Sequence, residues 1–404
     1  MIGSRSATHS IVKEPAKTRI CFFSSVASFD TGMPICTYAL ITHYAQDPRY
    51  QVHAVFPESG EFVDRLKAAA VPVSIVPFAR MRSPRRGVGF LLFCLTLPGA
   101  LVRVTCFMRK GRFALVHFSD IIDAPFYPCA AASGARVVAH VRRSIETRSG
   151  RCAFRLWSRM FAGAVVCISQ AVKRSVGDRR AAVVYDPGPD PRLFGASRSF
   201  PRPPTIDPGR LAVVTVAKFL RVKGHEHFIR MAALCEKAAP GRLQYLIVGD
   251  KQPGHESYYQ AVKDLMLELG LNRLITITGQ MPHEEIPALL SHTTVFVHLP
   301  NYQEGLGGVI LEAMAMAVPV VAFDSGGVSE CFVDGEQGFL VRQFDVAEAA
   351  RKVVLLATDA GLRNKLGGAG RAHAAKTFSY GKHFAAVDAV YQSLMSSKRT
   401  HARF

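Results

Sequence analysis

The sequence predicts an α/β protein built from two doubly wound, Rossmann-like domains that face a central cleft. The chain has 404 residues, more than one ordinary hydrophobic core accommodates, so two domains of about 200 residues each are expected. Strand-like and helix-like runs alternate along both halves, which is typical of parallel sheets covered by helices on both faces. Four prolines within residues 200–208 mark the linker between the halves.

The first half, residues 18–199, is predicted to form one domain. Its strands are the short apolar runs, and its helices are the longer segments between them. A turn at residues 186–190 follows the last strand. In chain order we expect a strand at 20–26, a helix at 33–44, a strand at 52–56, a helix at 61–70, strands at 73–76 and 114–119, a helix at 124–132, a strand at 136–140, a helix at 151–161, and strands at 164–168 and 182–185.

The second half, residues 209–378, repeats this alternation. Residues 379–404 are amphipathic and are expected to pack back across the linker onto the first domain. In chain order we expect a strand at 211–217, a helix at 225–238, a strand at 243–248, a helix at 258–269, a strand at 274–278, a helix at 284–290, a strand at 294–299, a helix at 309–317, a strand at 318–323, and helices at 346–357 and 360–377.

The termini and the cysteines indicate a protein of the reducing cytosol. Residues 1–17 lack the apolar core of a signal peptide and are interpreted as a loose tail. The nine cysteines form no C-x-x-C pair and show no regular spacing, so neither a zinc site nor a disulfide framework is indicated.

The positive charge of the chain is concentrated in its first half. Residues 1–200 carry 28 Lys and Arg against 12 Asp and Glu, a balance of +16, whereas the remaining residues carry 22 against 19, a balance of +3. A basic surface attracts the phosphates of nucleic acid or of anionic lipid. Nucleic acid is disfavoured, because the sequence shows no zinc finger, no RNP-like aromatic strand and no basic heptad helix.

An apolar segment in the first half favours a membrane surface. The segment from Val88 to Met108 is bracketed by Arg80, Arg82, Arg85 and Arg86 before it and by Arg109, Lys110 and Arg112 after it. It occupies the crossover-helix position between two predicted strands, and a proline-glycine pair interrupts it. We expect an apolar helix or helical hairpin lying on the cytoplasmic leaflet with its arginines at headgroup level. A buried crossover helix is the alternative, and a membrane span is disfavoured because it would split the domain.

A glycine-rich turn between two glutamates is the most informative motif in the chain. Residues 301–312 read N-Y-Q-E-G-L-G-G-V-I-L-E, which places Glu304 and Glu312 on either side of the turn. Glycines at a strand-to-helix turn let the backbone approach a ligand, and the N–H groups of a helix start favour phosphate. Ionised carboxylates accept hydrogen bonds from sugar hydroxyls. The motif therefore predicts a sugar-phosphate site, and the simpler alternative is a turn with two solvated glutamates.

Three further groups follow predicted strands of the second half. Lys218 and Lys223 lie in K-F-L-R-V-K-G, Gly249-Asp250 follows the next strand, and S-G-G-V-S-E occupies residues 325–330. The carboxyl ends of parallel strands share one edge of a sheet, so these groups are expected to converge. Two lysines beside glycine turns predict a diphosphate clamp, because ammonium groups neutralise phosphate oxygens. Each group alone is also ordinary loop chemistry, and their joint occurrence in this order favours a site.

This order of motifs resembles the retaining, nucleotide-sugar-dependent glycosyltransferases of family 4, also called glycosyl transferases group 1, which have the GT-B fold. The resemblance covers most of the chain and is strongest over residues 211–340, where K-x(4)-K-G, V-G-D, the two spaced glutamates and S-G-G-x-x-E occur in the order of the family. In the first half, C-I-S-Q-A-V-K at 167–173 and Y-D-P-G-P-D-P-R-L-F at 185–194 are similar to the family's S-x-x-x-K and N-G-V-D-x-x-x-F.

The resemblance implies a role for each matching residue. Lys218 and Lys223 would bind the donor diphosphate and steady the departing nucleotide. Glu312 would hold the ribose hydroxyls, and Glu304 would face the hydroxyls of the donor sugar. His140 would end a strand near that sugar. The other implied positions are Gly305, Leu306, Gly307, Gly308 and Val309 near sugar and phosphate, Gly249, Asp250, Gln280, Met281 and Pro282 near the base, and Gly32 on the acceptor side.

The sequence departs from the family pattern at three places. The family usually has G-R-x-x-x-x-K-G, whereas Lys218 replaces the arginine here, which keeps the charge but loses the bidentate guanidinium fork. The first loop has T-G, ending at Gly32, where the family usually has G-G. After the predicted strand that His140 ends, Arg142 and Arg143 either bind an acceptor that carries a phosphate or belong to the solvated basic face.

The expected reaction transfers a sugar from a uridine or guanosine diphosphate to an acceptor hydroxyl. Lys218, Lys223 and a helix N-terminus would stabilise the charge that grows on the leaving diphosphate. No D-x-D motif follows a strand, so cationic side chains are expected in place of a divalent metal. The resemblance implies retention of the anomeric configuration. The basic, apolar first domain predicts a glycan or lipid-linked acceptor, as in envelope polysaccharide or lipopolysaccharide synthesis.

Two other functions remain open at this point. A nucleotide-sugar epimerase could use the same scaffold, and turnover of the donor without any acceptor would favour it. A non-catalytic nucleotide-sugar-binding protein at the membrane is the other alternative, which the combination of two glutamates and two lysines disfavours. A dinucleotide oxidoreductase is remote, because no G-x-G-x-x-G follows the first predicted strand.

Overall fold

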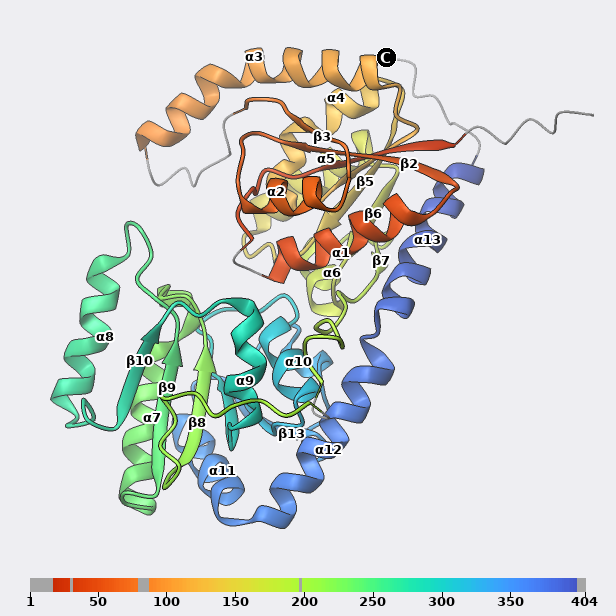
Figure 1. Ribbon diagram of the computed structural model, residues 1–404. Coiled ribbons are helices and arrows are strands. Elements are labelled where there is room, and N and C mark those ends of the chain that lie inside the picture. The colour runs from red at the N-terminus through yellow and green to blue at the C-terminus, as the bar shows by residue number, and fades with distance from the viewer. Residues whose placement is uncertain (1–16, 30–31, 79–86, 196–197, 398–404) are drawn as a thin grey trace, which may run out of the picture.

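A computed structural model describes residues 17–29, 32–78, 87–195 and 198–397 of the chain. It contains two parallel sheets, of seven and six strands, each flanked by helices (Figure 1). The prediction of two doubly wound α/β domains is therefore confirmed. The predicted tail up to residue 16 and the four arginines between residues 80 and 86 lie outside the described residues.

The first domain has the strand order β3-β2-β1-β4-β5-β6-β7. Neighbouring strands are parallel throughout. The strand order reverses between β1 and β4. Ligands of doubly wound sheets bind beyond the carboxyl ends of the strands at such a point. The strands are β1 (Thr18–Phe23), β2 (Tyr50–Phe56), β3 (Val73–Ile75), β4 (Leu115–Phe118), β5 (Arg136–Val141), β6 (Ala164–Cys167) and β7 (Ala182–Val183).

The helices of the first domain differ from the prediction in two places. The predicted helix at 124–132 begins earlier, as a 3₁₀ segment, because the Asp120 side chain caps its first turn. A short helix, α6, follows β6 and was not predicted. The helices are α1 (Gly32–Gln46), α2 (Glu61–Ala68), α3 (Gly87–Gly111), η1 (Ile121–Phe126), α4 (Tyr127–Ala132), α5 (Arg148–Phe161) and α6 (Gln170–Val176).

The second domain has the strand order β10-β9-β8-β11-β12-β13 and is parallel throughout. All six residues of its inner strand β9 are buried, as expected of a parallel sheet covered on both sides, whereas the edge strand β10 is mostly half-buried or exposed. The edge strand β13 was not predicted. The strands are β8 (Leu211–Val216), β9 (Leu243–Val248), β10 (Ile275–Gly279), β11 (Val295–His298), β12 (Val320–Asp324) and β13 (Gly338–Arg342).

Short helical segments follow most strands of this sheet and carry the loops of interest. The longer helices cover its two faces (Figure 1). The helices are η2 (Arg221–Lys223), α7 (His225–Ala238), α8 (Glu256–Glu268), η3 (His283–Glu285), α9 (Ile286–Ser291), α10 (Gly308–Ala315), η4 (Val328–Glu330), α11 (Val346–Thr358) and α12 (Ala360–Thr377).

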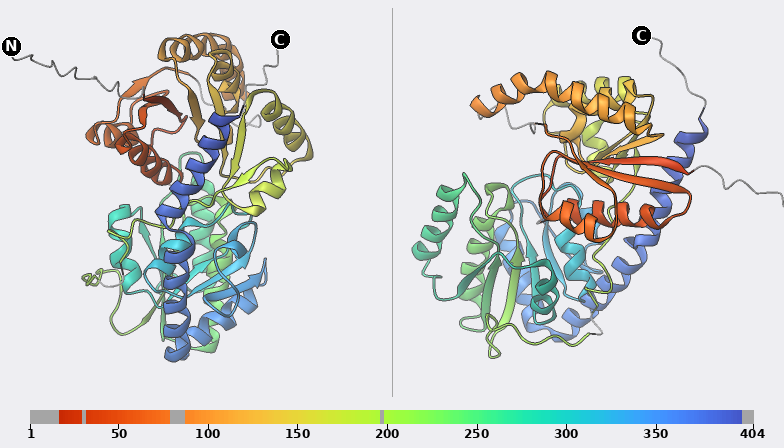
Figure 2. Two further views of the ribbon diagram at one scale, coloured as in Figure 1. Left: turned by 90° about the vertical axis from the view of Figure 1, so that its right-hand side faces the viewer. Right: turned by 45° about the horizontal axis from the view of Figure 1, so that its top comes forward.

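The last helix, α13 (Tyr380–Ser396), leaves the second domain and packs on the first, as Figure 2 shows. The Tyr391 hydroxyl lies 2.7 Å from His117 Nδ1 of β4. The Tyr50 hydroxyl donates to Asp388 at 3.1 Å. Val387 and Tyr391 belong to the same buried cluster as strand residues of the first sheet. The C-terminal helix therefore ties the two domains together by a second chain crossing besides the linker.

Helix α3 connects β3 to β4, and it has apolar side chains both on its buried side and on its exposed side. Its inner side chains, such as Val104 and Met108, are fully buried, whereas Leu91, Leu95 and Val102 on the outer side are more than half exposed. The stretch Leu91–Gly111 is long and apolar enough to cross a membrane by length and composition, yet it covers a sheet face. The structure therefore shows neither a fully buried crossover helix nor a helix detached from the domain.

Candidate functional site

Glu304 lies at the centre of a charged cluster just beyond β11. Its carboxylate accepts a hydrogen bond from Lys223 Nζ at 3.1 Å and another from the Tyr302 hydroxyl, and His298 Nε2 lies 3.2 Å away. Lys223 also donates to the Tyr302 oxygen at 2.8 Å. Burial alone would raise the pKa of Glu304, but the positive charge of Lys223 and the two further donors hold this pKa far below its usual range. The carboxylate is therefore ionised and held in one orientation.

A close backbone contact brings Lys223 to Glu304. Lys223 ends η2, and the next residue, Gly224, has φ +70° and lies against Leu299 at the end of β11. A Cβ atom on Gly224 would lie 2.0 Å from the Leu299 carbonyl oxygen, so only glycine fits. The lysine loop after β8 and the glutamate loop after β11 are therefore packed directly against each other.

The glycine turn, residues 304–308, is supported from below by a second glycine loop. Gly307 has φ +101°, and helix α10 begins at Gly308. The Gly327 N–H donates to the Glu304 carbonyl oxygen at 2.8 Å. A Cβ atom on Gly327 would lie 2.1 Å from the Gly305 carbonyl oxygen. The backbones of the two glycine loops are therefore packed directly against each other.

Glu312 lies on α10, one turn beyond its start, and pairs with a histidine. His283 Nε2 lies 3.2 Å from Glu312 Oε1, and both side chains are mostly buried. Burial lowers the pKa of His283, but the hydrogen bond and negative charge of Glu312 outweigh burial, so this pKa is raised. Glu312 is accordingly held at the junction of α10 and the loop after β10.

The other predicted residues of the second domain lie along the same edge of the sheet. Lys218 is half-buried directly after β8. Gly249 and Asp250 follow the neighbouring strand β9, and the Asp250 carboxylate accepts a hydrogen bond from the Lys251 N–H at 2.7 Å. Beyond β10, Gln280 is exposed, whereas Met281 is half-buried. The structure therefore places Lys223 and Glu304 in contact and the remaining residues on adjacent loops.

The predicted site residue His140 lies in the core of the first domain. It is fully buried within β5, and its Nδ1 lies 3.1 Å from Nε2 of His117, which in turn contacts Tyr391 of α13. Burial is the main cause that lowers the pKa of His140 well below its usual value. The imidazole is therefore linked to the C-terminal helix through His117, and its buried Nε2 has no hydrogen-bond partner among the described residues. Gly32, the other predicted residue of the first domain, is the exposed first residue of α1.

The two arginines that follow His140 have different environments. Arg142 is buried and donates to both oxygens of Asp186, with Nε 3.0 Å from Oδ2 and Nη2 3.2 Å from Oδ1. It therefore does not belong to a solvated basic face, and its charge is already matched. Arg143 is 59% exposed and pairs with Asp120 at 2.7 Å. Of the two, only Arg143 presents its guanidinium to solvent.

A buried carboxyl at the end of the first sheet was not predicted. Asp123 accepts hydrogen bonds from the Ser25 N–H at 3.0 Å, from the Ser25 hydroxyl, and from the Asp120 N–H at 3.2 Å. Burial is the main cause that raises the pKa of Asp123 to about 7, and its hydrogen bonds reduce this effect. The loops after β1 and β4 are thus joined by one carboxyl group.

Three residues of the Glu304 and Glu312 clusters were missed by sequence reasoning. His298 was not predicted because it ends a buried strand, where its polar character is the only feature that could indicate a role in the site. Tyr302 sits inside the motif, but its aromatic ring could equally pack in a core. His283 follows the loop that was predicted to lie near the base. These residues act through contacts between loops, which spacing along the chain does not reveal.

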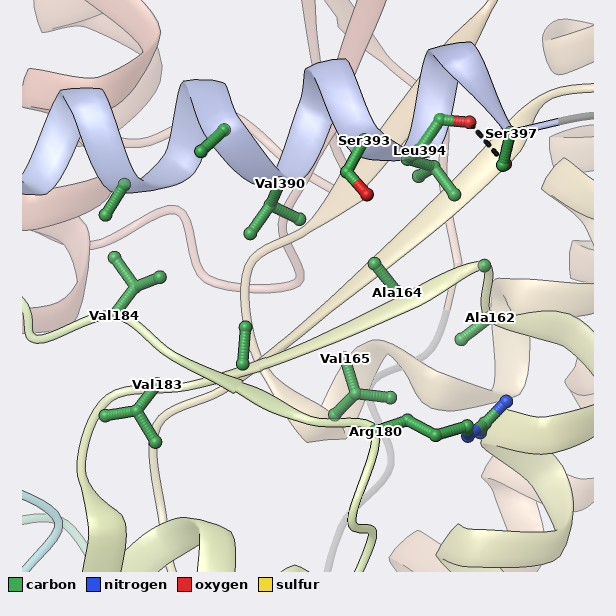
Figure 3. A pocket seen from close by; sticks show the side chains of 14 residues that line it. Ala162, Ala164, Val165, Arg180, Val183, Val184, Val390, Ser393, Leu394 and Ser397 are labelled. Atoms are coloured by element: carbon green, nitrogen blue, oxygen red, sulfur yellow. Dashed lines mark hydrogen bonds between the residues drawn. The ribbon is translucent and has the colours of Figure 1, made fainter.

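Two cavities in the described part of the chain differ in how close they lie to these residues. One of about 560 Å³ separates α13 from β6 and β7, and its lining is mostly small and apolar (Figure 3). It contains none of the predicted site residues. A smaller cavity of about 200 Å³ opens between the domains, where Ser144, Glu146 and Arg174 of the first domain face Gln303 and Gly326 of the second. This second cavity borders the glycine turn.

Comparisons with known proteins match part of the chain to one family. Residues 197–373 match the family described as glycosyl transferases group 1. Over 158 residues the chain is 37% identical to an alpha-D-kanosaminyltransferase of Streptomyces kanamyceticus, covering 39% of each protein. Over 220 residues it is 31% identical to a D-inositol 3-phosphate glycosyltransferase of Nocardia farcinica, covering 54% of this chain and 49% of that protein. The chain spans half the length, or less, of these relatives.

The structural similarity to a solved protein covers more of the chain than these sequence matches do. The structure matches Anabaena HepE, solved in complex with UDP and glucose, over 93% of this chain and 100% of that chain. The TM-score is 0.78, and the sequence identity is 19%. At this identity the match establishes the shared fold of both domains.

Proposed function

Because the second domain belongs to the glycosyl transferases group 1 family and the whole chain has the GT-B fold, we propose that this protein transfers a sugar from a nucleoside diphosphate to an acceptor hydroxyl. The transfer retains the anomeric configuration, as the sequence resemblance implies. The donor nucleotide is uridine or guanosine diphosphate. The UDP and glucose bound to the structurally similar HepE support a nucleotide-sugar donor.

The single observation that carries this proposal is the contact of Lys223 with Glu304 at the strand ends of the second sheet. In the proposed reaction, the ammonium group of Lys223 binds the diphosphate and stabilises the negative charge that develops as the anomeric C–O bond breaks. The Glu304 carboxylate accepts hydrogen bonds from the sugar hydroxyls. Glu312 holds the ribose. Lys218 adds positive charge in place of a divalent metal.

A thermal-shift measurement tests the donor proposal directly. We expect UDP or GDP, in the presence of EDTA, to raise the melting temperature of the full chain by several degrees, because a ligand that binds only the folded state stabilises it. The matching sugar conjugate should do the same. Uridine and guanosine alone are the controls and should have much smaller effects, since they lack the diphosphate. Absence of a shift with both diphosphates and their conjugates contradicts the proposal.

The proposed acceptor is a glycan or lipid-linked hydroxyl at the cytoplasmic face of the membrane, as in envelope polysaccharide or lipopolysaccharide synthesis. The support is the outer helix layer of the first domain, in which α3 packs on α4 and α4 on α5. These three helices contain no Asp or Glu and seven Lys and Arg. Leu95 and Val102 of α3 and Leu156 of α5 are each more than 60% exposed on this layer. Apolar side chains among cations suit an anionic lipid surface.

Charge reversal in this layer should release the protein from anionic vesicles. Arg109 and Lys110 are exposed in the last turn of α3. The double variant Arg109→Glu with Lys110→Glu is expected to weaken binding to phosphatidylglycerol vesicles by about tenfold or more, because each cation near the surface contributes about 1 kcal/mol. Co-sedimentation at low and high salt measures the effect.

A matched control carries the same charge change in the second domain. Arg230 and Lys263 are exposed on α7 and α8, and their reversal to Glu should leave vesicle binding nearly unchanged. Binding by the Arg109 and Lys110 variant that equals wild type and is insensitive to salt would show that this layer does not contact lipid.

A further inference from the structure

One carboxylate of the second domain binds backbone groups of the first. Glu330 ends η4, in the S-G-G-V-S-E segment that the proposed function leaves without a role. Its Oε2 accepts the Gln170 N–H and its Oε1 the Ala171 N–H, both at 2.7 Å. The Tyr185 hydroxyl donates to Oε2 at 3.0 Å. The Glu330 side chain is only 13% exposed. Hydrogen bonds from neutral donors to an ionised, buried acceptor are among the stronger ones in proteins.

A second contact lies beside the first and reaches the glycine turn. The Ser169 hydroxyl, at the start of the same short helix α6, donates to the Gly305 carbonyl oxygen at 2.6 Å. A Cβ atom on Gly305 would lie 2.5 Å from the Arg142 carbonyl oxygen, so the backbones of the two domains touch at this point. Glu330 and Gly305 therefore engage adjacent residues of the first domain.

These two contacts are linked within the second domain. The loop that leads to Glu330 contains Gly327, whose N–H donates to the Glu304 carbonyl oxygen at 2.8 Å. Movement of Glu330 thus displaces the backbone directly beneath Glu304. The joint also borders the smaller interdomain cavity, because Ala171 both donates to Glu330 and lines that cavity.

An ion pair elsewhere between the domains lacks the burial of these hydrogen bonds. Arg65 of α2 pairs with Glu284 of η3 at 3.1 Å, but both side chains are well exposed, at 40% and 51%. Exposed ion pairs contribute little to stability. The buried hydrogen bonds around Glu330 are therefore expected to hold the domains together more strongly than the exposed pair of Arg65 and Glu284.

We propose that Glu330 is a positioning residue that couples the placement of the first domain to the glycine turn that carries Glu304. When the Gln170 and Ala171 amides engage Glu330, Ser169 reaches Gly305, and the turn is held against Lys223. When the domains separate, the turn loses this support. The inference rests on the proposed function for its catalytic consequence, whereas the mechanical coupling is testable without any ligand.

Amide hydrogen exchange on the full chain tests the coupling. In the Glu330→Ala variant, the Gln170 and Ala171 amides lose their acceptor, and we expect their exchange to become about tenfold faster or more. The Gly327 amide should also exchange faster, since it sits between Glu330 and Glu304. Val172, whose N–H is capped by Ser169 Oγ at 3.0 Å, reports whether α6 itself stays folded. Glu284→Gln is the matched control, with one interdomain charge removed and wild-type exchange expected.

Two milder variants guard against misfolding of the alanine variant. Glu330→Gln keeps the shape but offers one acceptor oxygen for two amide donors. Tyr185→Phe removes only the third donor. We expect exchange at Gln170 and Ala171 to increase in the order wild type, Tyr185→Phe, Glu330→Gln, Glu330→Ala. Exchange that is unchanged in all three variants overturns the contact. Faster exchange at these amides with an unchanged Gly327 overturns the coupling.

Kinetics separate this inference from the proposed function. In Glu330→Gln we expect kcat to fall about tenfold, while the Kd for the diphosphate, measured by calorimetry, stays within about twofold of wild type. An equal loss in both quantities overturns the positioning role. Failure of wild type to bind UDP or GDP would instead refute the proposed function, and the exchange measurements would still decide whether the joint exists.

Discussion

Replacing Lys223 by alanine is expected to abolish sugar transfer and to destabilise the second domain. The substitution removes the ammonium group 3.1 Å from Glu304, whose side chain is only 13% exposed. Removing one member of a buried pair leaves an uncompensated charge and costs about 3–5 kcal/mol. Removing a group that stabilises a developing negative charge lowers kcat by about 10²- to 10³-fold. Both losses should therefore appear in this single variant.

A double variant separates the two losses. Adding Glu304→Gln to Lys223→Ala removes the unpaired charge, so urea unfolding should recover much of the lost stability, whereas transfer should stay absent. Lys251→Ala is the control, because Lys251 is an exposed lysine beside the same sheet edge, and it should behave like wild type in both measurements. Wild-type turnover by Lys223→Ala would remove this lysine from the site.

The fold was predictable because most helices and strands are indicated by the pattern of their own residues. Strands such as β6 are continuous apolar runs, and the alternation with helices leaves few topologies for two parallel sheets. The edge strand β13 was missed because its five residues, G-F-L-V-R, are too short and mixed in polarity to indicate a strand without their pairing to β12. The sequence favoured a surface position for α3 but left a buried crossover helix open, since an apolar crossover helix and an apolar surface helix have the same composition.

The candidate site was predictable only where sequence neighbours carry the chemistry. Lys223 and Glu304 each follow a strand of one sheet, so their meeting follows from parallel topology. The burial of His140 was not predictable, because residues on a strand alternate between its two faces and the sequence does not show what covers each face. His140 shares a face with Val138, whose buried cluster includes Tyr391 of α13. That helix lies about 250 residues later in the chain, and nothing near β5 in the sequence indicates that it covers this face.

Replacing Glu312 by alanine is expected to remove most of the affinity for the donor nucleotide and to abolish transfer. In the proposed complex, the Glu312 carboxylate accepts hydrogen bonds from two ribose hydroxyls, each of which contributes about 1.5–3 kcal/mol when the acceptor is charged. The Kd for the diphosphate should rise by about 100-fold or more, measured by calorimetry. Unlike Lys223→Ala, this variant leaves the Glu304 pair intact, so its loss appears first in binding.

The pairing of Glu312 with His283 adds a pH dependence to the stability of the wild-type protein, which the Glu312→Ala variant loses. The pKa of His283 is raised from 6.5 because the hydrogen bond and charge of Glu312 outweigh burial. A raised histidine pKa stabilises the folded state fully below the unfolded value, and this contribution is lost as pH rises through the folded value. Glu312→Ala should therefore be less stable than wild type near pH 6, and the two should converge at about pH 9.

A neighbouring glutamate provides the control for both effects. Glu285 is exposed two residues after His283, and Glu285→Ala removes the same charge without touching the proposed ribose contact. It should retain nucleotide affinity and show the wild-type pH profile of stability. If Glu312→Ala bound the diphosphate as tightly as Glu285→Ala, the glutamate on α10 would only orient His283. The ribose would then be held by other groups along the loops after β9 and β10.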